Sequence, residues 1–293
     1  MRSDRTTQFT GEMEFKNHLQ SIKATLVNYT SVAELESYIP EFCAITWLED
    51  IKQTERFLKS RGMNRQDMVM EMFHYRTLPT ALETVGLTFF LEGLDLTNVT
   101  HIIRHRLFSF SAQSTDPTSM EGHDILENDA FTADPELHER AVKLCEMANE
   151  LYIDALNKGL SFYDARHYQV RAKEAKYFMS GNIKDFVSFV NTRLGRTNQP
   201  TSDNILALRI RQQILEVYPF LEYQMPVEKI QNHYISAINC KMNMNTFPPD
   251  ALHREELHKR GIDWSDAKFN HPKPREESYH MRKFNKLVEE ITK

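Results

Sequence analysis

Between residues 65 and 92 the spacing of the apolar residues changes from a helical period to strict alternation. Between residues 65 and 78 they recur at intervals of three and four and stop before Pro79, which predicts a helix. In residues 85–92 they alternate with small or polar residues, a pattern typical of a strand with one buried face. Asp95 and the polar residues after it then predict the cap of a short helix.

The clearest helix is predicted at residues 135–158. Asp134 and Pro135 are typical of a helix start, and Gly159 is typical of the residue just beyond a helix end. Leucines and alanines recur at helical spacing and predict an apolar stripe: Leu137, Ala141, Leu144, Ala148, Leu151 and Ala155.

Further helices are predicted at residues 161–179, 183–193 and 205–217. The polar segments 108–133 and 195–204 are predicted to be loops. A loop as long as the first of these tends to be functional in a compact protein.

The chain beyond Pro249 is charged and poor in aliphatic residues. Its basic residues alternate with aromatic ones, a combination that can grip single-stranded nucleic acid. Acidic residues nearly cancel the charge, however, which favours an arm or lid that wraps a neighbouring subunit. We therefore expect an N-terminal extension at 1–45, a catalytic domain at 46–245 and a charged C-terminal arm at 246–293.

Composition narrows the classes of function. The 293 residues carry a net charge of -5, which argues against a dedicated nucleic-acid binder. No apolar run has the length of a membrane span, no secretory signal is recognisable, and Cys43, Cys145 and Cys240 are too scattered for a disulfide framework. A cytoplasmic protein is expected. Neither GxGxxG nor a Walker A loop occurs, so any phosphate must be held by side chains, foremost by arginine.

The triplet Arg104-His105-Arg106 follows an apolar run directly. Charges at the end of a buried element must be solvated, paired or bound to an anion. A guanidinium suits both phosphate and the imide edge of a pyrimidine. The triplet alone is more often a solvated helix end with incidental salt bridges.

The spacing around the triplet resembles the hallmark of flavin-dependent thymidylate synthases, RHRxxSxNxxSxR. Arg104, His105, Arg106, Ser109 and Ser114 match that pattern. Upstream, residues 82–90 resemble the family's FEH followed by a TFTF strand. Downstream, Arg166, Asn182 and residues 191–193 fall at the family's intervals, so the resemblance covers roughly residues 65–220.

The resemblance implies an α+β fold, rich in helices, with an antiparallel sheet and flanking helices. It also implies a homotetramer with active sites where subunits meet. The reaction implied is transfer of a methylene from methylenetetrahydrofolate to C5 of dUMP, with FAD and with electrons from NADPH. No membrane and no nucleic-acid partner is expected.

The family's functional positions carry over residue by residue. Arg193 and Arg104 are the expected catalytic residues, with Arg193 on the uracil edge. The expected nucleotide-binding residues are Arg166, Ser114, Gln113, Arg193 and His101. The expected flavin-binding residues are Arg104, His105, Arg106, Asn182 and Lys184.

The chain departs from the family pattern in several places. Thr84 stands for the histidine of FEH, Lys184 for an arginine, and Ser111 and Ala112 for an asparagine and a glutamate. Asp116 replaces an arginine, and an anion near a phosphate is unfavourable. Two interpretations remain open: an altered substrate or a hydroxymethyl product, or a nucleotide-binding protein that has lost catalysis.

Two other chemistries are compatible with isolated residues. His101 and His105 are four apart, a helical spacing that can ligate zinc, but no Glu or Cys at metal-motif spacing accompanies them. Cys240 could attack C6 of a pyrimidine, although most lone cysteines are structural. We expect no metal site.

Overall fold

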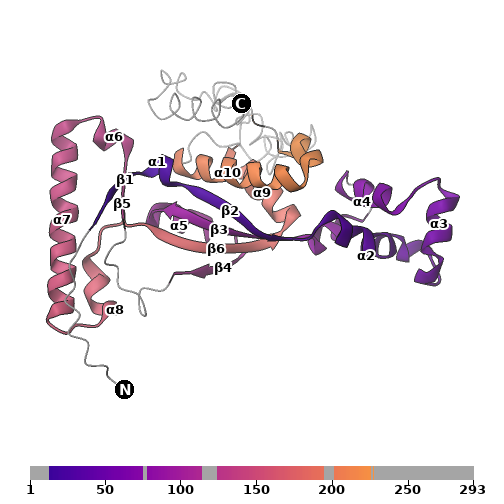
Figure 1. The fold of residues 1–293 in the computed structure, drawn as a ribbon, viewed down its shortest axis with the longest axis horizontal. Coiled ribbons are helices and arrows are strands. Elements are labelled where there is room, and N and C mark those ends of the chain that lie inside the picture. The colour runs from indigo at the N-terminus through magenta and orange to yellow at the C-terminus, as the bar shows by residue number, and fades with distance from the viewer. Residues whose placement is uncertain (1–12, 75–77, 114–123, 195–200, 226, 228–293) are drawn as a thin grey trace, which may run out of the picture.

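The computed structural model describes residues 13–74, 78–113, 124–194, 201–225 and 227, and Figure 1 shows how their helices and strands are arranged. The strands are β1 Phe15–Asn17, β2 Lys23–Tyr29, β3 Gly86–Leu94, β4 Ser109–Ala112, β5 Ile125–Glu127 and β6 Ala175–Asn182. The α-helices are α1 His18–Ser21, α2 Val32–Ala44, α3 Thr54–Ser60, α4 Arg65–Phe73, α5 Leu96–Ile102, α6 Asp129–Thr132, α7 Pro135–Asn157, α8 Phe162–Ala165, α9 Ile183–Leu194 and α10 Thr201–Val217. Short 3-10 turns are η1 Ile45–Trp47, η2 Ile51–Gln53, η3 Pro79–Thr84, η4 Arg166–Tyr168 and η5 Pro219–Gln224.

The main sheet has four antiparallel strands in the order β2-β3-β6-β4. In β3 the side chains of Leu87, Phe89 and Leu91 are buried while their neighbours are half-buried, as the alternation predicts. Strands β1 and β5 form a separate parallel pair. The expected α+β class with an antiparallel sheet is confirmed, whereas the small parallel pair was not foreseen.

Helices α9 and α10 lie over the sheet (Figure 1). The core forms between them, where the Phe89 and Phe186 rings lie 5.0 Å apart. Gly93 in β3 has φ +70°, and a Cβ there would lie 2.1 Å from the carbonyl oxygen of Ser21. The close approach of α1 to the sheet therefore requires glycine at this position.

Local signals located several helix ends correctly. The Asp95 side chain accepts from the backbone N–H of Asn98 at 2.8 Å and begins α5. Helix α7 ends one residue before the predicted boundary, and Gly159 follows it with φ +86°. Helix α9 covers the predicted 183–193 segment, with one residue more at its end.

The helix predicted at residues 161–179 is wrong. Only α8, four residues long, and the turn η4 occupy its first half, and the second half enters strand β6. Pairing with β3 on one side and β4 on the other fixes β6 as a central strand. Tertiary pairing here overrides a local pattern that fits either element.

The two predicted loops also contain regular structure. Strand β4, strand β5 and helix α6 lie within the described part of 108–133. Helix α10 begins at Thr201, inside the predicted 195–204 loop.

The described part of the expected N-terminal extension is built into the main fold. Strand β2 pairs with β3 along its length, and α2 packs on α4. The expected C-terminal arm lies outside the described residues. In the part of the chain that is described, no helix is both long and apolar enough to cross a membrane.

Candidate functional site

The Arg104-His105-Arg106 segment lies between the end of α5 and the start of β4. Phe108 anchors it, because its ring lies so close to Gly181 of β6 that a Cβ there would sit 2.5 Å from Phe108 Cδ1. The same ring packs against Phe186 at 4.7 Å. The segment is therefore held against the sheet and α9 by apolar packing.

Arg193, near the end of α9, contacts this segment. Its side chain is buried, with 7% of the residue exposed. Nη2 donates to the carbonyl oxygen of His101 at 2.7 Å, and Nε and Nη2 donate to His105 Nε2 at 3.2 and 2.9 Å. Nη1 lies 3.2 Å from the carboxylate of Asp203. The structure thus brings three of the predicted site residues together: His101, His105 and Arg193.

These contacts define the protonation of His105. A guanidinium can only donate, so His105 Nε2 must accept, and the neutral ring carries its proton on Nδ1. The ring also packs against Phe189 at 4.8 Å. Arg193 therefore fixes both the position and the tautomer of His105.

Asp203, at the start of α10, is the anionic centre of the cluster and is 1% exposed. It accepts from His101 Nδ1 at 2.9 Å and from Asn98 Nδ2 at 2.8 Å. Asn98 in turn meets His18 Nε2 at 2.9 Å and the hydroxyl of Ser202 at 2.8 Å. A buried charge needs such partners, because desolvation is otherwise very costly.

Sequence reasoning missed Asp203, Asn98 and His18. Asp203 fell inside a predicted loop, and a cap residue such as Asn98 is usually explained by its own helix alone. Arg193 itself could have indicated that such a partner exists. It follows the apolar positions of α9, and a buried arginine requires an anionic or carbonyl partner.

Other predicted cations are exposed. Arg104 and Arg106 lie on the surface at the end of α5. Arg166 in η4 is also exposed, and its guanidinium lies 4.7 Å from the centre of the Tyr163 ring. The turn η4 packs on α7 and α8, whereas α9 lies over the sheet (Figure 1). Within one chain, Arg166 and Arg193 thus belong to different parts of the molecule.

The remaining predicted residues have structural contacts of their own. Asn182 accepts from the backbone N–H of Asp185 at 3.0 Å and caps α9. Lys184 pairs with Glu83 at 2.8 Å, with both side chains about half exposed. Gln113 is exposed, and its backbone N–H donates to the carbonyl of Lys176. Ser114 lies outside the described residues, as do Asp116 and Cys240.

Thr84, which stands where the family has histidine, is bound within the protein. Its hydroxyl donates to the carbonyl of Ala81 at 2.7 Å and lies 3.0 Å from the Tyr38 hydroxyl. No group of three or more His, Cys, Asp or Glu side chains within the described ranges could hold a metal ion.

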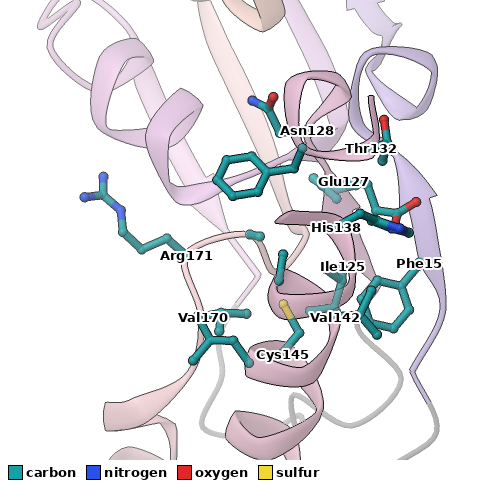
Figure 2. A pocket seen from close by; sticks show the side chains of 15 residues that line it. Phe15, Ile125, Glu127, Asn128, Thr132, His138, Val142, Cys145, Val170 and Arg171 are labelled. Carbon is teal, nitrogen blue, oxygen red and sulfur yellow. The ribbon is translucent and has the colours of Figure 1, made fainter. Parts of the chain in front are cut away.

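A second polar region lies beside α7, next to a cavity of about 250 Å³ (Figure 2). The cavity is mostly apolar, and His138 Nε2 meets Glu127 Oε1 at 2.6 Å on its wall. Lys173, one residue beyond the lining, is 5% exposed and donates to Asn149 Oδ1 at 3.1 Å. Burial lowers the pKa of Lys173 to about 8. Burial also raises the pKa of the Cys145 thiol.

A family model described as thymidylate synthase complementing protein matches residues 25–220. The chain belongs to this family. The match begins inside β2, so the family region extends about forty residues further toward the N-terminus than the motifs indicated.

Curated members of the thymidylate synthase complementing protein family resemble the chain over more than half its length. The flavin-dependent thymidylate synthase of Pyrococcus furiosus is 26% identical over 182 residues, which are 59% of this chain and 71% of the relative. The enzyme of the same name from Thermococcus onnurineus is 27% identical over 180 residues, 59% of this chain and 70% of the relative.

Solved structures share the fold. The UMP/dUMP methylase PolB from Streptomyces cacaoi, bound with 5-Br dUMP, superposes with a TM-score of 0.55 at 15% identity. That match covers 74% of this chain and 100% of PolB. The complex of PolB with 5-Br UMP gives a TM-score of 0.53 at 13% identity, covering 73% of this chain and 97% of the other.

Proposed function

We propose that the chain is a thymidylate synthase-like transferase that moves a one-carbon unit from methylenetetrahydrofolate to C5 of dUMP or a related pyrimidine nucleotide. The family and the flavin-dependent thymidylate synthases among its relatives support this proposal. So does PolB, a UMP/dUMP methylase with a similar fold. The observation that carries it is the cluster in which His101 and Arg193 contact the buried carboxylate of Asp203 and His105 accepts from Arg193.

The chemistry of the reaction explains why such a cluster is useful. C5 of uracil is a weak nucleophile until negative charge develops at N3 or O4. A cation that is fixed before the reaction and shielded from water stabilises that charge without reorganisation. Arg193 meets both conditions, because it is buried and its guanidinium is held by Asp203 and the His101 carbonyl. We infer that Arg193 and His105 face the base.

The phosphate of the nucleotide needs separate cations. Arg166 is exposed beside the Tyr163 ring, and its planar guanidinium is of the kind that suits a phosphate. Because Arg166 and Arg193 belong to different parts of one chain, we propose a homotetramer in which one subunit supplies Arg166 to the cluster of another.

The residues near the cluster fit a flavin dinucleotide. Arg104 and Arg106 offer two exposed guanidiniums at one helix end, a donor set suited to its phosphates. Lys184 also fits, since an exposed ion pair such as Lys184–Glu83 contributes little and can be exchanged for a ligand phosphate. These residues would hold FAD, which, once reduced by NADPH, would supply the two electrons that a methyl product requires.

Two products are chemically distinct. In both, the methylene carbon bonds to C5, its bonds to the folate nitrogens break so that tetrahydrofolate leaves, and the C5 proton is lost. A methyl product then needs two electrons as hydride, whereas a hydroxymethyl product needs only water and no reductant. Thr84 stands where the family has a histidine, and its hydroxyl is bound within the protein to Ala81 and Tyr38. Because this position departs from the family, hydroxymethylation is kept as the second candidate product.

The test of the proposed function is product analysis. The purified protein is incubated with dUMP, UMP, dCMP or CMP and isotope-labelled methylenetetrahydrofolate, with and without FAD and NADPH. Label in the base, located by mass spectrometry, supports the proposal, and its dependence on reductant separates methyl from hydroxymethyl. A protein that binds one of these nucleotides but transfers no label under any condition is the inactive nucleotide-binding homologue.

Arg193→Ala tests the role of the cluster. We expect a fall in kcat/KM of at least about 100-fold, the effect of removing one preorganised donor in other enzymes. The matched control is Arg211→Ala, because Arg211 is also a buried arginine but donates to the Met225 carbonyl away from the cluster. Both variants are assayed well below their melting temperatures. Equal losses in the two variants would contradict a specific role for Arg193.

A further inference from the structure

His101 in α5 is held by the protein through one ring nitrogen. Its Nδ1 lies 2.9 Å from Oδ2 of Asp203. A carboxylate can only accept, so Nδ1 carries a proton and Nε2 of the neutral ring keeps a lone pair. Within the described ranges no residue forms a hydrogen bond with Nε2 of His101. The ring therefore has one nitrogen fixed by Asp203 and a second nitrogen that can accept a proton.

The second nitrogen lies on the open side of the imidazole. The side chain of Asp203 is 1% exposed, whereas that of His101 is 30% exposed. Because Nδ1 is directed at the buried carboxylate, the exposed part of the ring is the edge that includes Nε2. A ligand at the cluster can therefore contact Nε2 while the bond to Asp203 stays intact.

Asp203 also places His101 beside Arg193. Its Oδ2 accepts from Arg193 Nη1 at 3.2 Å, and Arg193 Nη2 donates to the His101 carbonyl at 2.7 Å. The imidazole and the guanidinium thus share one carboxylate oxygen. In the proposed function Arg193 stabilises charge at N3 or O4 of the base. O4 is bonded to C4, the neighbour of C5, so a group beside Arg193 is within reach of C5.

We propose that His101 is the catalytic base that removes the proton from C5 of the pyrimidine, an inference that rests on the proposed function. When the C5=C6 electron pair bonds to the methylene carbon, C5 carries both a hydrogen and the new substituent, and C6 is electron-deficient. Nε2 of His101 takes the C5 proton, and the electron pair of the C5–H bond restores the C5=C6 double bond. The imidazolium then gives its proton to water. The step is the same for a methyl and a hydroxymethyl product.

The charges around His101 suit this role. Asp203, on α10, keeps the proton on Nδ1 and stabilises the imidazolium once Nε2 has accepted the second proton. Arg193, on α9, is a cation beside the same oxygen, so the carboxylate lies between the two positive groups. Arg104, three residues further along the chain, is exposed to solvent. A base and a fixed cation on one anion can act on one ring without either leaving its place.

The other groups of the cluster are less suited to accept the proton. His105 already uses Nε2 to accept from Arg193, so a proton there would turn a donor toward a guanidinium. Both oxygens of Asp203 are engaged, one by Asn98 and the other by His101 and Arg193. The contacts of the cluster therefore single out His101.

The first test is His101→Gln in the full-length protein. Glutamine keeps an N–H group for Asp203 but has no basic nitrogen. With dUMP, or whichever of the four tested nucleotides the wild type labels, kcat should fall about 100-fold or more. The dissociation constant of the nucleotide should stay at the wild-type value, and the melting temperature verifies the fold.

The matched control is His138→Gln. His138 is also a histidine on a carboxylate, 2.6 Å from Glu127, with a side chain 39% exposed. It lies beside α7, away from the cluster, so its substitution should leave kcat unchanged. Equal losses of kcat in the two variants would contradict a specific role for His101.

Two further measurements separate a base from a residue that only supports the fold. With a nucleotide deuterated at C5, the isotope effect on kcat should be larger in His101→Gln than in the wild type, because proton removal becomes rate-limiting. In His101→Ala, added imidazole should restore turnover in proportion to its neutral form. His138→Ala should not respond to imidazole.

The outcomes distinguish this inference from the proposed function. If the wild type transfers no label to any nucleotide, the proposed function is wrong and the inference is wrong with it. If the wild type transfers label and His101→Gln keeps the wild-type kcat, or changes KM alone, another group removes the proton and the proposed function stands. A loss of kcat with neither a larger isotope effect nor rescue by imidazole also overturns the inference.

Discussion

Arg193 and Lys173 are both buried cations among the described residues, and their environments differ in one respect. Arg193 lies beside the carboxylate of Asp203, which is itself bonded to His101 and Asn98. Lys173 lies beside α7, where it contacts the neutral amide of Asn149 and the face of the Tyr152 ring, 5.4 Å away. Asp203 therefore gives Arg193 a full counter-charge. The contacts of Lys173 with Asn149 and Tyr152 provide dipoles instead.

This difference decides what each cation does as pH changes. A carboxylate beside Arg193 keeps both charges in place, since a guanidinium does not lose its proton in the physiological range. At Lys173 burial dominates and lowers the pKa to about 8, so that the charge of the amine is partly lost just above neutrality. A fixed positive charge suits a site that stabilises an anion, which is why the proposed chemistry is assigned to Arg193.

Among the substitutions that test this difference, Asp203→Ala is expected to change the free energy of unfolding most. This substitution leaves the buried guanidinium of Arg193 without its carboxylate. The free energy of unfolding should fall by about 3–5 kcal/mol, the usual cost of removing one partner of a buried pair. Denaturant unfolding measures it, with Asp203→Asn as the control that keeps an acceptor for His101 and Asn98. A loss below about 1 kcal/mol, the range of an exposed pair, would contradict the described network.

A smaller effect is expected from the titration of Lys173. Below about pH 8 the folded and unfolded chains both carry the proton, and the cost of burying the charge is fully present. Between that pH and the ordinary lysine pKa of 10.5, the folded chain has released the proton and the unfolded chain still binds it, so stability rises with pH. The rise should reach about 3 kcal/mol.

The variant Lys173→Met isolates this contribution. It has no amine to titrate, so the difference in unfolding free energy between it and the wild-type protein should change across the same pH interval. Other lysines and tyrosines cancel in that difference. A difference that stays constant with pH would mean that the pKa of Lys173 is not lowered in the folded protein.

The smallest effect concerns the helix that carries Arg193. Asn182→Ala removes the side-chain cap of α9 and should cost about 1 kcal/mol in unfolding free energy, measured by denaturant titration. It should loosen Arg193 and leave the pH dependence due to Lys173 unchanged, because Asn149 and Tyr152, which contact that lysine, belong to α7. Asn182→Asp keeps the cap and should retain wild-type stability. If both variants are equally destabilised, Asn182 has another role than capping.

Sequence alone predicted the elements that depend on local interactions. The cap at Asp95, the glycine after α7 and the alternation in β3 are visible within a few residues of each boundary. The structure of residues 175–182 depends on two distant strands, so the local pattern predicted a helix where β6 forms. The family positions predicted that His101, His105 and Arg193 belong to one site, and these residues lie together in the structure. Asp203 was not predicted, because it belongs to no motif.

The stripe on α7 was likewise predicted correctly as a pattern but not as an orientation. Periodicity shows that a helix has an apolar side, and it cannot say whether that side meets the same chain or another one. Tyr152 and Leu156, packed with Ala165, turn the other side of α7 inward and leave the leucines exposed.

The Asp203-centred network also has a consequence for the order of folding. Its bonds join residues that are far apart in the chain: 80 positions separate His18 from Asn98, 105 separate Asn98 from Asp203, and 88 separate His105 from Arg193. Such non-local contacts stabilise the chain only after large loops have closed, so they form slowly and late. During synthesis on the ribosome, Arg193 emerges before its carboxylate. The network can therefore be completed only after α10, which carries Asp203, has been synthesised.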